Sequence, residues 1–341
     1  MRVARLYTAH DIRFEEEPVP SVGPGQALIK TRACGICSGD VMAWYIEKKA
    51  PVVFGHEPAG EIVELGSGVS EFQPGDRVFI HHHAPCFACR ACRRGDFVQC
   101  STWRSSRIIP GGMAEYVLVP KENLAGDTLR LPADLSFADG SLIEPTACAV
   151  KALRRARLRA GDSVCVIGLG IMGQLNVALA RHAGAGTVMG TDFVAYRRDK
   201  ALELGADAVF DPADGPVEDA VRDYTGGEMA ELVIVGPGTV EAMQLGIRCA
   251  AKGGTVLLFT TSTPEARLPL APYELYFNEV SLVPSYSCGP NDTREALRLI
   301  GTGVIQSERF ITHRFPFAAI HDAYQNAAAA QDSLKTIIEF P

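Results

Sequence analysis

A glycine-rich run between an apolar strand pattern and an apolar helix pattern constrains what the second half of this chain can fold into. Residues 163–167 form a short apolar stretch of the kind that parallel sheets bury on both faces. Glycine-rich positions 168–173 follow it, and then come an apolar helical pattern to His182 and a second strand pattern over 187–191 that ends at Asp192. This order of strand, glycines, helix, strand and acid predicts a parallel βαβ unit that binds a dinucleotide.

Each part of this unit has a role toward the dinucleotide. Glycines allow a tight turn and a close approach of the backbone to a pyrophosphate, and the helix N-terminus that follows favours the negative charge. An acid at the end of the second strand accepts hydrogen bonds from the ribose hydroxyls and repels a 2′-phosphate. We therefore expect NAD rather than NADP, with the coenzyme bound by Gly168, Leu169, Gly170, Ile171, Met172, Gly173, Asp192 and Arg197.

Two arginines after Asp192 leave the choice of coenzyme open. Arg197 and Arg198 either stack on the adenine or, with Asp192 turned aside, hold a phosphate. NADP therefore remains the alternative coenzyme.

The length of 341 residues predicts two domains. The spacing of apolar residues becomes helical between Leu142 and Arg157, and we place the domain boundary there. Residues 1–150 alternate short strand patterns with turns rich in proline and glycine, which predicts a compact β-rich domain. Residues 151–285 alternate strands and helices and predict a doubly wound parallel sheet, while residues 286–341 finish that domain and return to the first. The expected fold class is α/β.

Four of the ten cysteines fall within one short segment. The chain is large, and its N-terminus lacks the charged and apolar regions of a signal peptide, so metal accounts for these thiols better than disulfides do. Four closely spaced thiolates enclose one tetrahedral ion and leave no open position, which predicts a structural zinc. An iron–sulfur cluster uses related spacings and is the alternative. The ligands are Cys86, Cys89, Cys92 and Cys100, in a lobe spanning residues 86–100.

A second set of metal donors comes from three distant parts of the chain. Cys37 lies in a glycine-rich bend, His56 follows a glycine, and Glu144 lies at the start of the helical stretch. A thiolate, an imidazole and a carboxylate provide three ligands and leave a fourth position open, which is the arrangement of a catalytic zinc. Taken alone, each residue is more simply a buried thiol, a core histidine or a surface acid. Together with the cysteine lobe and the dinucleotide unit, they predict a catalytic metal.

The charge and hydropathy of the chain exclude two classes of partner. The net charge is −7 and the basic residues are scattered, so the chain has no basic stripe for nucleic acid and no polybasic patch for a membrane surface. No apolar run approaches the roughly 18–20 residues of a membrane span. We therefore expect a cytoplasmic protein whose partner is a small molecule.

Over essentially its full length the chain resembles the zinc-dependent medium-chain alcohol dehydrogenases. The segment GHEPAGEIVELGSGV fits the zinc signature of that family, the four-cysteine lobe fits its structural zinc site, and GLGIMG with Asp192 fits its coenzyme domain. Glu144 with Pro145, where other alcohol dehydrogenases carry a cysteine ligand, resembles the sorbitol and threonine dehydrogenase branch. The resemblance implies a GroES-like catalytic domain joined to a Rossmann coenzyme domain, in a homotetramer or homodimer.

The resemblance also implies a reaction and a role for each site residue. Cys37, His56 and Glu144 would bind the catalytic zinc. Glu57 would exchange onto this metal, and Asp40 would orient the imidazole of His56. With the zinc of the cysteine lobe, this makes two zincs per chain. The enzyme would oxidise a secondary alcohol of a polyol, sugar, cyclitol or amino alcohol to the ketone, by hydride transfer from a zinc alkoxide to nicotinamide.

Two other functions remain open at this stage. One is an NADPH-dependent zinc aldehyde or ketone reductase, and the other is a non-catalytic zinc protein that binds a dinucleotide. The second is left open by a departure from the family pattern, because Gly39 and Met42 occupy the places where relatives usually carry a relay hydroxyl and a histidine. Either Ser38 takes over in a shifted bend, or Glu57, a histidine or water carries the proton.

Two further groups of residues each have two interpretations. Met42, Trp44 and Tyr45 either line the substrate pocket or form a helix core. The three consecutive histidines at 81–83 either face the cleft or lie at a surface or an interface.

Overall fold

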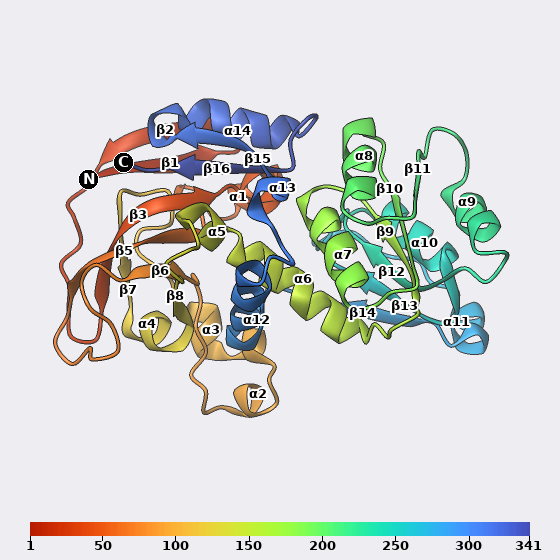
Figure 1. The fold of residues 1–341 in the computed structure, drawn as a ribbon, viewed down its shortest axis with the longest axis horizontal. Helices are drawn as coiled ribbons and strands as arrows, with labels where there is room; N and C mark the ends of the chain where they lie inside the picture. The colour runs from red at the N-terminus through yellow and green to blue at the C-terminus, as the bar shows by residue number, and fades with distance from the viewer. The chain divides into compact units, whose positions relative to one another are not determined.

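The computed structural model describes residues 1–341, and the chain divides into two compact units (Figure 1). Unit 1 contains Met1–Ala147 and Cys288–Pro341, and unit 2 contains Cys148–Ser287. From the sequence we expected boundaries at 150 and 285. Unit 2 is thus a continuous segment, whereas unit 1 is assembled from both ends of the chain.

Unit 1 is built on a mostly antiparallel sheet of seven strands. Its order is β15 (Ile311–Pro316), β16 (Lys335–Glu339), β3 (Ala27–Gly35), β5 (Pro58–Leu65), β6 (Arg77–Ile80) and β8 (Thr128–Arg130), with β7 (Tyr116–Val119) pairing with β3. A second sheet contains β2 (Asp11–Glu16), β1 (Arg2–Thr8) and β4 (Val52–Val53). The strand β16, near residue 340, therefore lies beside β3, near residue 30, and the two pair antiparallel.

The core of unit 1 fills the space that these strands enclose. Ile29, Ile62 and Val78 are fully buried in one apolar cluster, and Phe54, Phe317 and Ile320 are buried in another. Burial of such side chains contributes about 1.5–3 kcal/mol each. Short helices close the unit: η1 (Ser38–Val41), α1 (Ala43–Glu47), α2 (Arg90–Arg93), η2 (Phe97–Gln99), α3 (Ser101–Ser105), α4 (Lys121–Asp127), α5 (Phe137–Ser141), α12 (Pro290–Gly301), α13 (Ser307–Phe310), η3 (Phe317–Ala319) and α14 (Ile320–Ala329).

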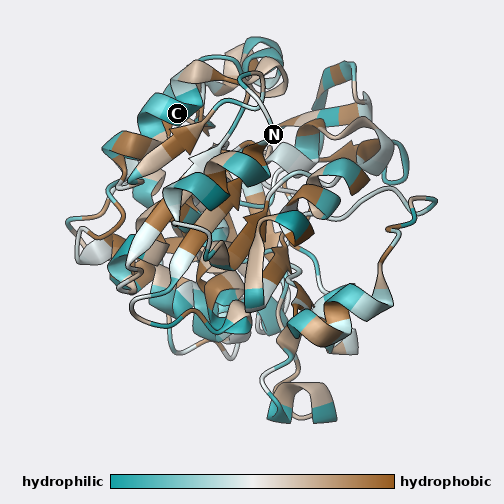
Figure 2. Cartoon of the chain, turned by 90° about the vertical axis from the view of Figure 1, so that its right-hand side faces the viewer, coloured by the Kyte–Doolittle hydropathy of each residue, from teal (hydrophilic) through white to brown (hydrophobic).

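Unit 2 is a six-stranded parallel sheet with helices between its strands, as the βα alternation predicts. The order is β11 (Ala208–Phe210), β10 (Thr187–Thr191), β9 (Ser163–Ile167), β12 (Ala230–Val235), β13 (Ala250–Leu258) and β14 (Ser281–Pro284). The helices are α7 (Ile171–His182), α8 (Ala195–Glu203), α9 (Val217–Tyr224), α10 (Val240–Arg248) and α11 (Pro272–Asn278), preceded by α6 (Ile143–Ala156). Hydrophobic residues concentrate on the strands, whereas the helices also carry hydrophilic residues (Figure 2).

The strand order of unit 2 reverses at β9, which pairs with β10 on one side and β12 on the other. Helix α7 contacts α8, and α9 contacts α10, which fits one pair of helices on each face of the sheet. This reversal is the point where doubly wound sheets bind ligands, beyond the carboxyl ends of the strands. The predicted α/β fold, a β-rich domain with a doubly wound parallel-sheet domain, is confirmed.

Two elements differ from the sequence expectation. The helical pattern from Thr239 to Ala251 ends early, because α10 stops at Arg248 and β13 already begins at Ala250. Helix α11 was not predicted: it is rich in apolar residues such as Tyr273, Tyr276 and Phe277, but so short an apolar run has no helical period that separates it from a strand, and none of its side chains is buried. None of the helices combines the length and apolar character that a membrane span requires.

Candidate metal centre and coenzyme loop

Three potential metal ligands of unit 1 converge at the ends of neighbouring elements. Cys37 follows β3 and is the N-cap of η1, while His56 and Glu57 lie in the turn just before β5. Gly55 has a φ of +86°, and this left-handed bend lets two adjacent side chains point into the same site. One ligand atom from each of Cys37, His56 and Glu57 lies within 4.8 Å of the others.

Asp40 ties the cysteine and the histidine of this group together. Its Oδ2 accepts a hydrogen bond of 3.1 Å from the Cys37 N–H, and its Oδ1 lies 3.5 Å from Nδ1 of His56. Burial raises the pKa of Asp40, but the facing His56 outweighs this effect, so the pKa lies below its ordinary value. A carboxylate at Nδ1 fixes the imidazole tautomer and leaves Nε2 for a metal ion.

Glu57 forms a buried ion pair that the sequence did not reveal. Its Oε2 lies 2.5 Å from Nζ of Lys335 on β16, and Lys335 also donates a hydrogen bond of 3.1 Å to the carbonyl of Ile36. Burial raises the pKa of Glu57, and burial acting on Lys335 is outweighed by Glu57, so the pKa of the lysine is raised as well. The carboxylate is therefore held in a fixed position beside Cys37 and His56.

Glu144 lies in a different group of potential ligands. Its carboxylate and the ring nitrogens of His81 and His82 lie within 4.8 Å of one another, whereas the group around Cys37 contains Glu57. His81 is fully buried and His82 half-buried, so these two histidines do not lie at a free surface. Burial, followed by repulsion from His81 and His83, holds the pKa of His82 well below its usual value, which leaves its imidazole neutral.

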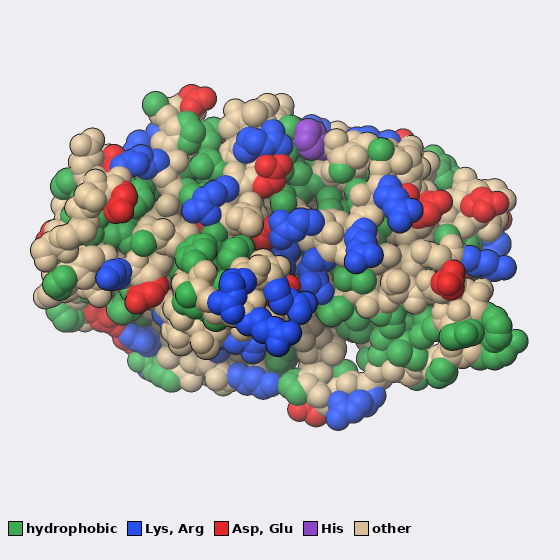
Figure 3. Space-filling view, turned by 90° about the horizontal axis from the view of Figure 1, so that it is seen from below, with side chains coloured by type: hydrophobic (Ala, Val, Ile, Leu, Met, Phe, Trp, Pro, Cys, Tyr) green, Lys and Arg blue, Asp and Glu red, His purple; other side chains and the backbone are tan.

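The sulfur atoms of the cysteine lobe gather around one point. Sγ of Cys89 lies 3.5 Å from Sγ of Cys92, and Sγ of Cys86 lies 3.6 Å from that of Cys100 and 3.9 Å from that of Cys92. Ligand bonds of about 2.3 Å in a tetrahedral zinc site separate the sulfurs by about 3.8 Å, so the observed distances fit one zinc ion. The arginines of α2 and Arg94 are exposed, on a face where basic side chains gather (Figure 3).

The glycine-rich loop of unit 2 connects β9 to α7. Gly168 has a φ of +85°, which favours glycine, and a Cβ on Gly173 would lie 2.1 Å from the carbonyl oxygen of Gly168. A Cβ on Gly170 would meet nothing within 4 Å. Gly173 therefore brings helix and loop together, whereas Gly170 leaves open the space that a pyrophosphate needs at the start of the helix.

Asp192 lies at the end of β10, next to this loop. Its Oδ2 accepts a hydrogen bond of 2.8 Å from the Leu169 N–H, and its Oδ1 accepts one of 2.9 Å from the Val194 N–H. Arg197 approaches Oδ2 at 3.3 Å, while Arg198 pairs with Asp211 at 2.7 Å. The carboxylate is thus fixed at the carboxyl end of the sheet, where the ribose of a dinucleotide binds.

Comparison with known proteins identifies a family domain in each half of the chain. Residues 23–128 match the alcohol dehydrogenase GroES-like domain, and residues 172–302 match the zinc-binding dehydrogenase domain. Sorbitol dehydrogenase of Bombyx mori is 32% identical over 334 residues, which cover 94% of this chain and 93% of that protein. The chain belongs to the zinc-dependent medium-chain dehydrogenase family, in its sorbitol dehydrogenase-like branch.

Other members of the medium-chain dehydrogenase family show the same similarity. L-galactonate-5-dehydrogenase of Escherichia coli K12 is 30% identical over 346 residues, and the matched region covers 100% of this chain and 99% of that protein. A zinc-binding dehydrogenase structure from Sinorhizobium meliloti 1021, bound to NADP, has a TM-score of 0.89 and 32% identity, covering 99% of this chain and 98% of that one. These relatives support an oxidoreductase that acts on an alcohol or polyol with a nicotinamide coenzyme.

In this medium-chain dehydrogenase, Gly39 and Met42 stand at the two positions where a proton-relay hydroxyl and a histidine were expected from the resemblance. Gly39 has no side chain, and its N–H donates to the Cys37 sulfur at 3.4 Å. Met42 caps α1, in which Ile46 is the buried residue, while Trp44 and Tyr45 are half-buried and pack edge to face at 5.6 Å between ring centroids. The two interpretations of Met42, Trp44 and Tyr45, a pocket lining and a helix core, both stay predictions.

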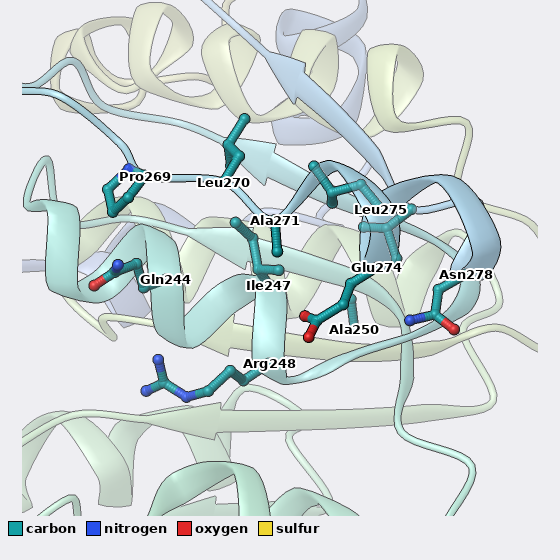
Figure 4. A pocket seen from close by; sticks show the side chains of 11 residues that line it. Gln244, Ile247, Arg248, Ala250, Pro269, Leu270, Ala271, Glu274, Leu275 and Asn278 are labelled. Carbon is teal, nitrogen blue, oxygen red and sulfur yellow. The ribbon is translucent and has the colours of Figure 1, made fainter.

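A pocket of about 240 Å³ lies in unit 2 of this dehydrogenase, between α10 and α11 (Figure 4). Arg248 and Glu274 are charged residues of its lining, and Ile247 and Leu275 are apolar ones. None of the proposed metal ligands and no residue of the glycine-rich loop lines it. It is therefore separate from the coenzyme loop.

Proposed function

We propose that this chain is a zinc-dependent dehydrogenase that oxidises a secondary alcohol of a polyol, sugar, cyclitol or amino alcohol to its ketone with NAD. The observation that carries the proposal is the convergence of a thiol, an imidazole and a carboxylate, from Cys37, His56 and Glu57, within 4.8 Å of one another. Three such donors leave one position of a tetrahedral ion for the substrate oxygen.

The residues around this group hold it ready for an ion. Asp40 orients His56 through Nδ1, and Lys335 holds the Glu57 carboxylate in place. When bound, a zinc ion supplies a Lewis acid that lowers the pKa of an oxygen ligand to about 7. We propose Cys37, His56 and Glu57 as its ligands, in preference to the set that includes Glu144, because Glu144 groups with two histidines.

We propose that the proton of the alcohol leaves through water. Neither Gly39 nor Met42 has a group that can carry a proton, and Ser38 lies in η1 as part of the bend that Cys37 caps. A water chain transfers protons as well as a side chain does when it reaches the reacting oxygen.

NAD is the proposed coenzyme because of the position of Asp192. Its carboxylate is hydrogen-bonded to the N–H groups of Leu169 and Val194, and a 2′-phosphate beside it would be repelled. The Sinorhizobium meliloti relative bound to NADP favours the second candidate, an NADPH-dependent ketone reductase. Arg198 is engaged with Asp211, which leaves Arg197 as the cation nearest to Asp192 for that alternative.

We propose a reducing compartment and a homo-oligomer for this protein. None of the ten cysteines forms a disulfide, which fits the cytoplasm. Strand β14 lies at one edge of the unit 2 sheet and pairs only with β13, so a second copy can extend the sheet across a two-fold axis. A dimer or tetramer follows from such pairing.

The test is a coenzyme-linked screen of polyols, sugar acids, cyclitols and amino alcohols, in which the absorbance of NADH reports turnover. We expect turnover with NAD on at least one substrate class and loss of about 1000-fold or more in Cys37→Ser, because a ligand of the catalytic ion is altered. Cys165→Ala, a buried cysteine of β9, is the matched control and should keep its activity. Turnover with NADPH alone would favour the reductase, and no turnover with either coenzyme would contradict both.

A further inference from the structure

Lys49 carries a positive charge just after α1 that no acidic side chain of the chain neutralises. Its Nζ lies 3.7 Å from the centroid of the Tyr45 ring, four positions earlier, and it forms no ion pair. The face of an aromatic ring attracts a cation, so Tyr45 holds the ammonium in one place without neutralising it. The ammonium therefore keeps hydrogen-bond donors for a further partner.

The ring of Tyr45 borders a small open space beside Cys37. A Cβ on Gly39 would lie 3.7 Å from Sγ of Cys37 and 4.0 Å from Cε1 of Tyr45, both of which are ordinary contact distances. Gly39 also has no positive φ, so neither its backbone conformation nor the packing around it requires a glycine. The glycine instead leaves room next to both the sulfur of a proposed metal ligand and the ring that holds Lys49.

The charge of Lys49 also acts on a histidine of this region. Burial holds the pKa of His82 well below its usual value, and repulsion from the neighbouring histidines and from Lys49 adds to this effect. The ring of His82 lies 5.0 Å from that of His56, centroid to centroid. Two separate contacts, one through Tyr45 and one through His82, therefore relate Lys49 to the proposed metal ligands Cys37 and His56.

We propose that Lys49 binds a carboxylate of the substrate, so that this chain prefers sugar acids to uncharged polyols. The proposal rests on the proposed function, because the hydroxyl that is oxidised has to reach the ion at Cys37, His56 and Glu57 while the carboxylate reaches Lys49. A single ammonium matches the single charge of a carboxylate. A phosphate ester carries about −1.5 to −2 at pH 7 and is typically bound by several cations.

An exposed lysine that only packs on its neighbour is the competing explanation. Side chains four positions apart at a helix end lie next to each other, so the contact between Lys49 and Tyr45 arises without any ligand. On this view, loss of the charge of Lys49 changes the affinity for a sugar acid and for an uncharged polyol equally. The two explanations therefore differ in a binding constant, which is measurable without turnover.

The experiment is isothermal titration calorimetry of the zinc-loaded full-length protein, saturated with reduced coenzyme so that no alcohol is turned over. The probes are gluconate and sorbitol, which differ only in a carboxylate or a hydroxymethyl group at one end. We expect gluconate to bind about fivefold more tightly, as for a partly exposed ion pair. Lys49→Met should abolish this preference and leave the affinity for sorbitol within about twofold, whereas Lys49→Arg should keep the preference. Lys48→Met removes the same charge one position earlier and is the matched control, which should keep it too.

Several outcomes decide the proposal. No binding of gluconate, or equal affinity for gluconate and sorbitol in the wild type, would overturn it. A preference that Lys49→Met retains would also overturn it, because the metal ion would then be what binds the carboxylate. Sorbitol 6-phosphate tests the other anion, and tighter binding of it than of gluconate, lost in Lys49→Met, would replace the carboxylate by a phosphate.

The same measurements separate this proposal from the proposed function. Failure of the proposed function would show as no NADH formation from any alcohol of the screen, whatever the calorimetry gives. Failure of the role of Lys49 alone would show as turnover of alcohols by a protein whose binding of gluconate does not depend on Lys49.

Discussion

Nζ of Lys335 lies 2.5 Å from Oε2 of Glu57, although the two side chains are only 1% and 0% exposed. Removing an ion pair from water costs several kcal/mol per ion, and the attraction between the charges offsets this cost only while both are present. Lys335 therefore keeps a carboxylate charged at the place where the proposed metal ion binds. The pair joins the last strand of the chain to the turn before β5.

The first prediction concerns this pair. Lys335→Met should lower the free energy of unfolding of the metal-free protein by about 3–5 kcal/mol, because the Glu57 carboxylate is left buried without a partner. Urea unfolding of the protein after treatment with a chelator measures the difference. Lys252→Met, at an exposed lysine, is the control and should change stability by about 0.5 kcal/mol or less.

The double variant Lys335→Met with Glu57→Gln separates the charge effect from lost packing. It should be more stable than Lys335→Met alone, since no unpaired charge remains. Equal stability of Lys335→Met and Lys252→Met would contradict this account of the pair.

Two glycines of the coenzyme loop should respond differently to the same substitution. Gly173→Ala should destabilise the protein by about 1–3 kcal/mol, because its Cβ would lie 2.1 Å from the Gly168 carbonyl oxygen. Gly170→Ala has open space around its Cβ and should cost about 1 kcal/mol or less. It should nevertheless weaken NAD binding about tenfold or more, because the methyl group occupies the pyrophosphate space.

Unfolding curves and coenzyme titrations by fluorescence quenching measure the two effects. Weaker NAD binding in Gly170→Ala at nearly unchanged stability is the expected signature. A Gly170→Ala protein that binds NAD as the wild type does would show that the pyrophosphate lies elsewhere.

The charge of Asp192 should set the coenzyme preference. Asp192→Asn keeps an oxygen that can accept the Leu169 N–H and removes the charge that repels a 2′-phosphate. Charged hydrogen bonds contribute about 1.5–3 kcal/mol, so the ratio of kcat/KM for NADP to that for NAD should rise about tenfold or more. Asp199→Asn, at an exposed position of α8, is the control. An unchanged ratio in Asp192→Asn would argue that another residue selects the coenzyme.

Metal removal should open the cysteine lobe. Chelation should expose the lobe to trypsin, which cuts after the exposed residues Arg90, Arg93 and Arg94, because metal binding is what folds so small a segment. Cys89→Ser should give the same fragments without chelator and lose one metal ion per chain. Mass spectrometry of the digest identifies the cuts. A chelated protein that resists trypsin at these arginines would mean that the lobe folds without metal.

Local patterns revealed much of this molecule. The glycine-rich loop, its flanking strand and helix, and the acid at Asp192 lie within about one βαβ unit, so their spacing predicts their arrangement. The cysteine lobe is equally local, and its four sulfurs do gather as the spacing suggests. The assignment of zinc to these residues stays a prediction.

Contacts between segments that are distant in the sequence could not be predicted from it. The partner of Glu57 depends on β16 pairing with β3, and a single lysine at the start of an apolar strand carries no signal of it. Which acid accompanies Cys37 and His56 depends on how α6 packs, so spacing did not separate Glu57 from Glu144. His81 has a buried carboxylate partner in Asp127 that only the tertiary structure brings to it.

Because β16 supplies an inner strand of the unit 1 sheet, synthesis must pass β16 before that unit can close. The continuous unit 2 is complete earlier, so it is expected to fold first during synthesis. Until Lys335 emerges from the exit tunnel, Glu57 lacks its counter-ion on the nascent chain. The site proposed for zinc is therefore incomplete until that point.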